Sequence, residues 1–341
     1  MVSAHALDTL ESRVSANFLN TLDARGVSGG SLRVILTGGA GFIGRAVWRK
    51  LLRANHEVLV IDNFSRTPPP VKEEVMRWAG DAVRVEDVRN CGKLKEIFRE
   101  FRPEAVIHLA ALIDVVESVA RPHLYFDVNA TGTASVAEAA SEASVERVIY
   151  ASSAAVYGEP IHLPIGESHP TDPVNPYGAS KLAGELAIKS VSKVRHSPNY
   201  VILRLFNVYG PGQNESSPYA GVITKFIHRA KEGKPPIIFG DGKQVRDFIH
   251  VEDVAEAFLK ALTTGATNTT FNIGSGKPIT INELAEAVIN ASGRVLQPIH
   301  SKPRTGDIRS SYASIDKARS VLRWEPKKDL TASIREMLLG A

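Results

Sequence analysis

The 341-residue sequence contains a single cysteine and no long run of apolar residues. Cys91 alone cannot form an internal disulfide. Together with the absence of an apparent secretory signal, this predicts a protein of the reducing cytoplasm. A membrane-spanning helix needs about 18 consecutive apolar residues, and no segment approaches that length. We therefore expect a soluble chain that does not act in a membrane.

Concentrated runs of Lys and Arg are also missing. The 41 basic and 37 acidic residues leave a formal net charge of only +4. Runs of basic residues usually mark a surface for nucleic acid or membrane, so we expect neither partner. The mild positive excess is compatible with an anionic small substrate, and no metal site is predicted. The length and the 43% hydrophobic content favour a globular protein of two packed lobes.

Residues 1–30 precede the first strand pattern and end in glycines and serine, which predicts an appended N-terminal extension. Apolar residues recur in it at helical spacing, so an amphipathic helix docked on the body or on a partner chain is one interpretation. A frayed tail, or a start codon placed too early, is the other. Acidic residues within the segment argue against a transit peptide.

From residue 32 onward, short β-branched runs alternate with helical stretches. This pattern is typical of βαβ units and predicts an α/β fold with a doubly wound parallel Rossmann sheet. The predicted strands are Arg33–Leu36, Val58–Ile61, Val83–Glu86, Ala105–His108, Arg147–Ala151 and Val201–Leu205.

After Phe206 this rhythm gives way to Pro- and Gly-rich loops and to helices expected at Gly221–Glu232 and Asn282–Ala291. We therefore expect a smaller, mixed α/β lobe over the strand ends. The predicted organisation is a dinucleotide-binding domain over 31–206, with 247–275 packing back on it, and a substrate lobe formed by 207–246 and 276–341.

Three glycines follow the first predicted strand and open a helix that runs to about Ala54. Gly38 permits the tight turn, Gly41 leaves room for a pyrophosphate, and Gly44 lets the helix and the strand pack closely. The helix N-terminus supplies N–H donors and positive potential for the phosphates. The strand–turn–helix context makes this a strong dinucleotide motif.

The second predicted strand ends in Asp62, where a carboxylate can accept hydrogen bonds from the adenosine ribose and would repel a 2′-phosphate. This favours NAD over NADP, although Arg66 nearby keeps NADP open. A turn or cap role for Asp62 is the alternative. Asp87, just beyond the third strand, could contact the adenine, or it could be an ordinary loop aspartate.

Tyr177 and Lys181 are separated by one helical turn, and Asn175 and Pro176 before them suit an N-cap and a first helical position. The helix start would place Tyr177 at its exposed opening. A nearby ammonium and the positive nicotinamide ring would stabilise the phenolate, so that Tyr177 can act as a general base. Ser153, at the end of the fifth strand, could bridge the phenol and a substrate hydroxyl, or it could be a cap serine.

Together, Thr37–Gly44, Ser152–Gly158 and Tyr177–Lys181 resemble the extended short-chain dehydrogenase/reductase family. The resemblance covers roughly residues 32 to 335. It is strongest to the UDP-glucose 4-epimerase group of the NAD-dependent epimerases and dehydratases, with Leu203–Asn207 and Val245–His250 as further shared motifs. It implies NAD as cofactor, a UDP-sugar substrate and a homodimer.

The resemblance also implies site residues. The cofactor site would comprise Gly38, Gly41, Phe42, Ile43, Gly44, Asp62, Asn63, Asp87, Val88, Leu109, Ala110, Ala111, Asn129, Tyr177, Lys181 and Phe206. The catalytic residues would be Tyr177, Lys181 and Ser153. The substrate would contact Ser153, Tyr177, Asn207, Arg246, Arg304 and Asp307, and arginine forks do suit a diphosphate.

Ala154 and Ala155 occupy positions where related nucleotide-sugar dehydratases carry an acidic pair and decarboxylases usually keep a glutamate. Their absence favours C4 epimerisation of UDP-glucose and UDP-galactose. Ser311 stands where the family often has a bulky aromatic, so UDP-N-acetylhexosamines or UDP-glucuronate could also be accepted. Another nucleotide-sugar oxidoreductase or decarboxylase, or a non-catalytic NAD-binding sensor, remains an alternative.

Overall fold

The computed structural model describes residues 30–213, 221–303 and 308–340. Contacts divide the chain into a segment 1–31 and a compact unit from Leu32 to Ala341. All but one residue of the N-terminal extension lie outside the described residues, and so does the docked helix considered for it. The compact unit is described below.

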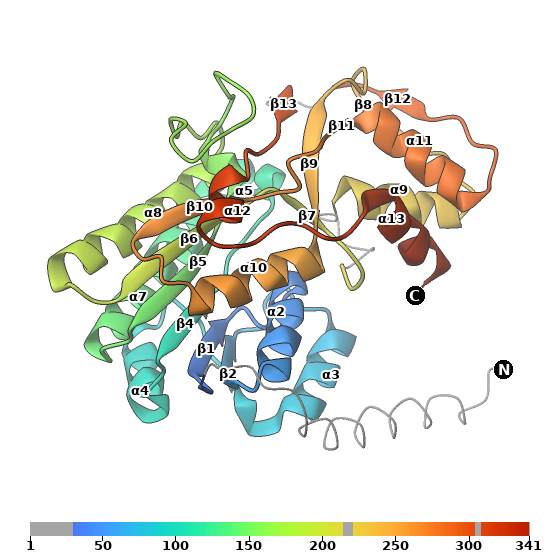
Figure 1. Ribbon diagram of the computed structural model, residues 1–341. Helices are drawn as coiled ribbons and strands as arrows, with labels where there is room; N and C mark the ends of the chain where they lie inside the picture. The colour runs from blue at the N-terminus through green and yellow to red at the C-terminus, as the bar shows by residue number, and fades with distance from the viewer. Residues whose placement is uncertain (1–29, 214–220, 304–307, 341) are drawn as a thin grey trace. The chain divides into compact units, whose positions relative to one another are not determined.

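A seven-stranded parallel sheet forms the centre of this unit (Figure 1). Its order is β10 (Thr269–Ile273), β6 (Asn199–Leu205), β5 (Arg147–Ser153), β4 (Ala105–His108), β1 (Arg33–Thr37), β2 (Glu57–Asp62) and β3 (Val83–Val85). The predicted doubly wound α/β fold is confirmed.

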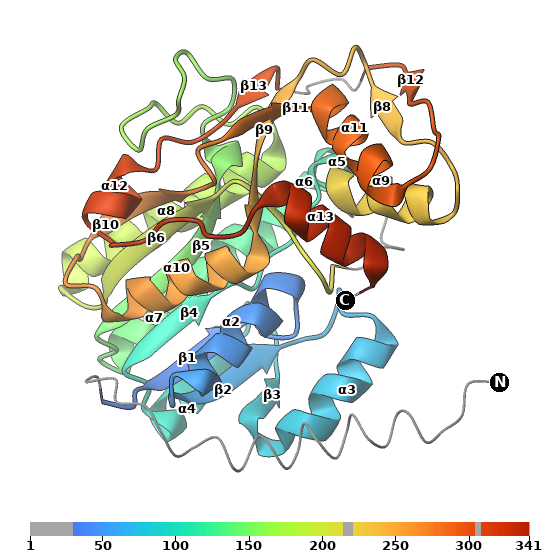
Figure 2. The same cartoon turned by 45° about the vertical axis from the view of Figure 1, so that its right-hand side comes forward.

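Apolar side chains on both faces of the strands explain why the sheet is covered twice. In β1, Val34 and Leu36 pack into one core cluster and Ile35 into the other, as expected for side chains that alternate along a strand. The first cluster is covered by α2 (Phe42–Arg53), α3 (Pro69–Ala79), α10 (Val251–Thr263) and α12 (Asp316–Ser320). The second is covered by α4 (Cys91–Phe101), α7 (Gly132–Glu142) and α8 (Pro176–Arg195) (Figure 2).

Short helical segments connect β4 to α7. They are α5 (Val115–Ala120), α6 (Pro122–Phe126) and a π-helical turn over Asp127–Thr131. Two 3₁₀ turns lie elsewhere, over Gly80–Ala82 before β3 and over Ala154–Val156 after β5.

A smaller group of strands and helices lies beyond β6 in the sequence. The strands are β7 (Asn207–Tyr209), β8 (Ile237–Phe239), β9 (Val245–His250), β11 (Pro278–Thr280), β12 (Ile299–Ser301) and β13 (Ser310–Ser311). The helices are α9 (Val222–Lys231), α11 (Ile281–Ser292) and α13 (Leu330–Leu339), which share a third core cluster. Strand β9 pairs with β7, β11 and β13, and β8 pairs with β12.

The structure corrects the sequence-based strands by adding β10 and by moving several strand ends: β3 ends at Val85 instead of Glu86, and β6 begins at Asn199 instead of Val201. The predicted set has six strands in the sheet, whereas β10 adds a seventh beside β6. Thr269 and Thr270 in β10 are only half-buried, so this edge strand lacks the continuous apolar run of its neighbours. Strand β5 also extends beyond Ala151 to Ser153, because both serines continue the pairing with β6.

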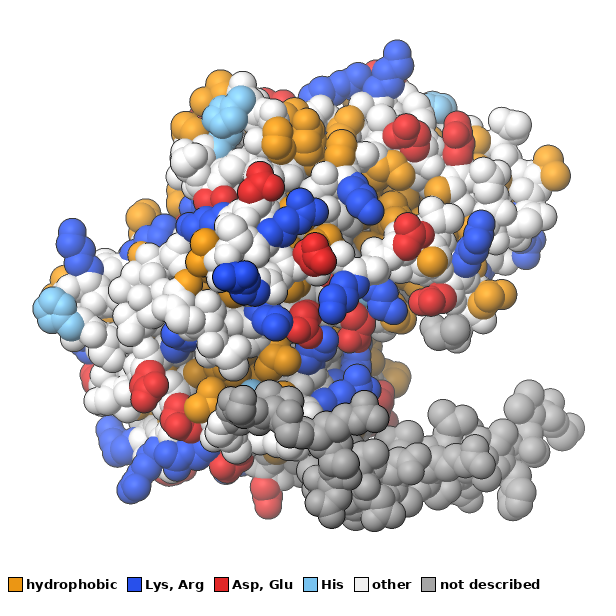
Figure 3. All heavy atoms as spheres, in the orientation of Figure 1, with side chains coloured by type: hydrophobic (Ala, Val, Ile, Leu, Met, Phe, Trp, Pro, Cys, Tyr) orange, Lys and Arg blue, Asp and Glu red, His pale blue; other side chains and the backbone are white. Residues whose placement is uncertain are grey.

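The view in Figure 3 shows basic and acidic side chains interspersed over the described surface on this face. Among the described residues, none of the helices has both the length and the apolar character needed to cross a membrane.

Candidate active site

The expected site residues of the central sheet gather at the carboxyl ends of its parallel strands. The glycine motif follows β1, Asp62 ends β2, and Leu109 to Ala111 follow β4. Ser153 ends β5 and Phe206 follows β6. Because all of these strands run in the same direction, their ends meet at one edge of the sheet, where open α/β folds bind ligands.

The glycine loop has the geometry that the sequence predicts for a phosphate site. Gly38 has φ +72°, and a Cβ there would lie 2.6 Å from the backbone N of Ala110. A Cβ at Gly44 would collide with the carbonyl oxygen of Gly38. Helix α2 begins after Gly41 without a side-chain cap, so its first N–H groups remain available to an anion. The loop therefore fits the diphosphate of a dinucleotide.

Asp62 holds the glycine loop in place. Its carboxylate accepts hydrogen bonds from the N–H groups of Ala40 (3.0 Å) and Phe64 (2.8 Å). Burial raises the pKa of Asp62, and these backbone donors oppose the rise. The turn role considered from the sequence is thus present. Both carboxylate oxygens keep further lone pairs for a ribose.

Arg66, the residue that keeps NADP open in the sequence, is engaged by a carboxylate. Its Nη2 donates to both oxygens of Glu117 at 2.7 Å. A guanidinium held in this way is directed toward Glu117, which favours NAD over a cofactor with a 2′-phosphate.

The carboxylate of Asp87 is hydrogen-bonded to neighbouring side chains. It accepts hydrogen bonds from Asn63 Nδ2 (2.8 Å) and from Arg89 Nε (2.9 Å) and Nη2 (2.8 Å). These bonds, led by that from the Arg89 side chain, lower the pKa of Asp87 to about 2. Val88 beside it is buried against Gly132 at the start of α7.

The start of α8 follows the predicted capping pattern and brings the phenol to the serine. Asn175 accepts a hydrogen bond from the Gly178 N–H (2.9 Å), and Pro176 is the first helical residue. Gly178 packs so closely on the Ala155 carbonyl that a Cβ would collide with it. Since Ala155 N–H donates to Ser153 Oγ (3.1 Å), this contact sets Tyr177 beside Ser153.

Tyr177 is half-buried, which corrects the exposed position expected from the helix start. The ring of Tyr125 from α6 packs edge-on against it, with centroids 6.5 Å apart. Burial raises the pKa of Tyr177, and a hydrogen bond with the Ser153 side chain lowers it in part. The protein alone therefore keeps the phenol protonated, and additional positive charge is needed to form a phenolate.

Lys181 is buried one turn further along α8, with only 3% of its surface exposed. Its Nζ lies 4.3 Å from the centroid of the Tyr150 ring, within range of a cation–π interaction. Burial lowers the pKa of Lys181 to about 7, while the negative charge of Glu185 raises it. The ammonium is thus poised to change its charge near neutral pH.

A buried ion pair behind this set has no counterpart in the residues predicted from the sequence. Glu185 of α8 accepts hydrogen bonds from Ser152 Oγ (2.6 Å) and from Arg204 Nε (2.8 Å) and Nη2 (2.7 Å). Both ionic side chains are almost fully buried. The pair ties α8 to β5 and β6. The position of Glu185 one turn after Lys181 was the available sequence signal.

Asn129 lies fully buried in the π-helical turn. Its Nδ2 donates to the Leu112 carbonyl and to Ser180 Oγ, both at 2.9 Å, and its Oδ1 accepts from the Leu112 N–H at 2.8 Å. Asn129 therefore fastens the segment after β4 to α8, next to the glycine loop and the phenol.

Two of the expected substrate residues, Asn207 and Arg246, lie on β7 and β9. Asn207 Nδ2 donates to the Asp247 carbonyl (2.9 Å), and Phe206 before it is buried. Arg246 is half-buried on β9 and pairs in register with Ser311 of β13. Asp247 of β9 accepts hydrogen bonds from Ser275, Gly276 and Ala313, and so holds the segment before β11 and the segment after β13 against β9. Arg304 and Asp307 lie outside the described residues.

A parallel sheet with a glycine loop after its first strand, together with a Tyr–Lys pair beside a serine, defines a nicotinamide-dependent enzyme fold. The model of the NAD dependent epimerase/dehydratase family matches residues 34–274. The chain belongs to this family, and its cofactor is NAD.

Within this family, the chain is similar to UDP-sugar 4-epimerases. The chain is 38% identical over 306 residues to a putative UDP-glucose 4-epimerase of Methanocaldococcus jannaschii, which covers 89% of this chain and 97% of the relative. The Thermotoga maritima UDP-glucose 4-epimerase, solved with UDP-glucose, superposes with a TM-score of 0.85 at 33% identity and covers 90% of this chain and 98% of that one. A UDP-N-acetylglucosamine 4-epimerase of Methanobrevibacter ruminantium, solved in complex with UDP-N-acetylmuramic acid, superposes with a TM-score of 0.83 at 34% identity. The match covers 91% of this chain and 98% of that one. The family resemblance predicted from the sequence is confirmed.

Proposed function

We propose that this protein is an NAD-dependent isomerase that inverts C4 of a UDP-hexose, interconverting UDP-glucose and UDP-galactose. The observation that carries the proposal is Ser153 beside Tyr177, followed by two alanines in place of acidic residues. Relatives with these names over almost their whole length support it.

The proposed mechanism assigns proton transfer to Tyr177 and Ser153. Tyr177 removes the proton of the sugar 4-hydroxyl through its phenolate, and Ser153 hydrogen-bonds to the phenol and to that hydroxyl. Lys181, whose pKa is lowered to about 7 by burial, provides positive charge near the phenol in its protonated form. NAD, held by the glycine loop and Asp62, would supply a hydride acceptor at C4 that can also return the hydride. Proton and hydride both return, so the reaction has no net redox change.

Elimination and decarboxylation are disfavoured by the residues after Ser153. Ala154 and Ala155 form a 3₁₀ turn against the start of α8, and Ala154 packs with Leu182 in an apolar cluster. Neither side chain can give or take a proton. The two alternative functions give different results. A net oxidoreductase would form one NADH for each sugar converted, and a non-catalytic NAD-binding sensor would convert no sugar.

We propose that the substrate lobe consists of 207–246 and 276–341, with the dinucleotide domain over 31–206 joined by 247–275. In this proposal Arg246, Arg304 and Asp307 hold the nucleotide diphosphate and ribose, and Asn207 contacts the sugar. The cofactor would contact Leu109 to Ala111 in addition to the glycine loop. Alanine at Arg246 should raise KM for the UDP-sugar and leave NAD binding unchanged.

We further propose that the pocket accepts UDP-N-acetylhexosamines or UDP-glucuronate, because Ser311 is small and lies in register with Arg246. The similarity to a UDP-N-acetylglucosamine 4-epimerase supports this substrate range. Turnover of UDP-glucose alone, in a panel with UDP-GlcNAc and UDP-glucuronate, would contradict it.

We also propose a homodimer in the cytoplasm, as expected from the family resemblance. Sedimentation velocity of the purified protein should give twice the chain mass of 36.9 kDa. Fractionation of expressing cells should place the activity in the cytosol.

The test of the function is incubation of the purified protein with UDP-galactose and no added NAD, followed by chromatography for UDP-glucose. Product should form with the wild type and not with Tyr177→Phe, which retains the ring and lacks the hydroxyl. The proposed function would be refuted if the wild type, with added NAD, converted neither UDP-galactose nor any of UDP-glucose, UDP-GlcNAc and UDP-glucuronate.

A further inference from the structure

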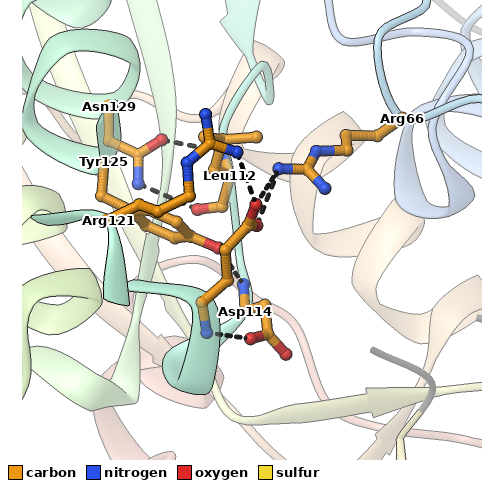
Figure 4. A network of polar contacts seen from close by, with 7 residues as sticks. Arg66, Leu112, Asp114, Arg121, Tyr125 and Asn129 are labelled. Carbon is orange, nitrogen blue, oxygen red and sulfur yellow. Dashed lines mark hydrogen bonds and ion pairs between the residues drawn. The ribbon is translucent and has the colours of Figure 1, made fainter. Parts of the chain in front are cut away.

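An ion pair links two segments on either side of β1. Arg66 belongs to the segment after β2, and Glu117 belongs to α5, in the segment after β4. Strand β1 lies between β2 and β4 in the sheet. Arg66 Nη2 contacts both carboxylate oxygens at 2.7 Å, so the pair bridges the segments that follow β2 and β4; Figure 4 shows Arg66 reaching across to this network.

The segment that carries Glu117 lies directly against the glycine loop. A Cβ on Gly38 would be 2.6 Å from the Ala110 nitrogen and 2.9 Å from the Leu109 carbonyl carbon. The glycine loop and the Arg66–Glu117 pair therefore share one edge of the sheet, with Asp62 at the end of β2 beside them.

Glu117 is the fixed half of the pair. Tyr125 donates its hydroxyl proton to Glu117 Oε2 (3.0 Å), and only 13% of the Glu117 side chain is exposed. The same hydroxyl accepts a hydrogen bond from the Asp114 N–H (3.0 Å), whose side chain caps α5. Figure 4 shows Arg66, Arg121 and Tyr125 meeting at this carboxylate, with Asp114 below it.

Arg66 is the half that can move. Its side chain is 41% exposed and extends from a loop, whereas Glu117 is held by α5 and α6. A planar guanidinium that binds both oxygens is the most directional form of such a pair. Its exposure limits the strength of the pair, because water and salt compete with the contact.

We propose that Arg66 and Glu117 form a clasp across the NAD site that must part before the dinucleotide leaves, so that these two residues set the residence time of NAD. The clasp also reaches the catalytic end of the site, since Tyr125 packs edge-on against Tyr177. An enzyme whose cofactor is regenerated in each cycle gains from slow release. The proposal rests on NAD binding and does not depend on the identity of the sugar.

The test measures NAD release from the holoenzyme. Protein loaded with NAD is diluted into ethanol and alcohol dehydrogenase, so that each released NAD is reduced and detected as free NADH. Arg66→Ala should release NAD about three- to fivefold faster than the wild type, which corresponds to about 0.7–1 kcal/mol for one partly exposed bidentate pair. Glu117→Gln should behave similarly.

Arg121→Ala is the matched control. Arg121 also contacts Glu117, at 3.4 Å, but the two residues are four positions apart in the chain, so this contact does not link the segments after β2 and β4. The Arg121 side chain is 60% exposed. The release rate of this variant should stay within about twofold of the wild type. Added salt should speed release from the wild type and have little effect on Arg66→Ala.

Arg66→Ala leaves the contact between Tyr125 and Glu117 in place, so its result stands even if Glu117→Gln folds poorly. Release from Arg66→Ala at the wild-type rate would overturn the proposal. An equal acceleration in Arg121→Ala would also overturn it, because it would indicate a general effect of surface charge.

Discussion

Replacing Glu185 by Gln should be among the most destabilising single changes near the active site. None of the Glu185 side chain and only 6% of the Arg204 side chain is exposed. Glutamine keeps the size and removes the charge, so the Arg204 guanidinium would remain buried without its counter-charge. Removing one partner of a buried ion pair costs about 3–5 kcal/mol, and we expect a loss of this size.

Urea unfolding followed by far-ultraviolet circular dichroism would measure this loss. Glu185→Gln combined with Arg204→Met should recover part of it, because both charges are then absent. Recovery should be incomplete, since Arg204 also lies over the Tyr157 ring at 4.8 Å. Lys189→Ala is the control: Lys189 contacts Glu185 at 3.1 Å but is 33% exposed, and should cost less than about 1 kcal/mol.

The stabilisation by Glu185 should depend on pH, and its pKa shift gives the direction. Burial alone would raise the pKa of Glu185, but Arg204, Ser152 and Lys189 lower it overall. The stabilisation is therefore present above the unfolded-state pKa and is lost as the pH falls through the lower folded-state pKa. A loss below about 1 kcal/mol for Glu185→Gln, or a double variant no more stable than the single one, would refute this reasoning.

Three further predictions follow from the same site. Burial lowers the pKa of Lys181 to about 7, so above that pH the unfolded chain binds more protons than the folded protein. The stability of the cofactor-free protein should therefore rise from about pH 7 to 10. Lys181→Met should flatten this rise in urea titrations, and an unchanged slope would contradict the prediction. Gly44→Ala should abolish NAD retention, because its Cβ collides with Gly38, and normal retention by a folded variant would count against the loop geometry. Ser311→Tyr should reduce turnover of UDP-GlcNAc more than that of UDP-glucose, and equal effects in a competition assay would argue against a role in substrate size.

The fold and the glycine loop could be predicted because their physical requirements are local in the sequence. The turn at Gly38, the close packing at Gly44 and the cap at Asn175 each depend on neighbouring residues, and the structure shows all three. The parallel sheet follows from the alternation of strands and helices.

Other features depend on residues that are distant in the sequence. Tyr177 is half-buried and contacts Tyr125 of α6, which the start of its own helix does not reveal. Arg204 lies in an apolar strand, and only the folded structure shows that Glu185 neutralises it. The contact of Arg66 with Glu117 likewise needs β2 and β4 to flank β1.

The most direct test of the account follows a deuterium at C4. Holoenzyme without added NAD is given UDP-galactose labelled with deuterium at C4, and the UDP-glucose formed is examined by mass spectrometry and NMR. The deuterium should return to C4 of the product, with no net accumulation of NADH. Loss of the deuterium to solvent, or reduced cofactor formed in proportion to product, would contradict inversion through a transient 4-keto sugar.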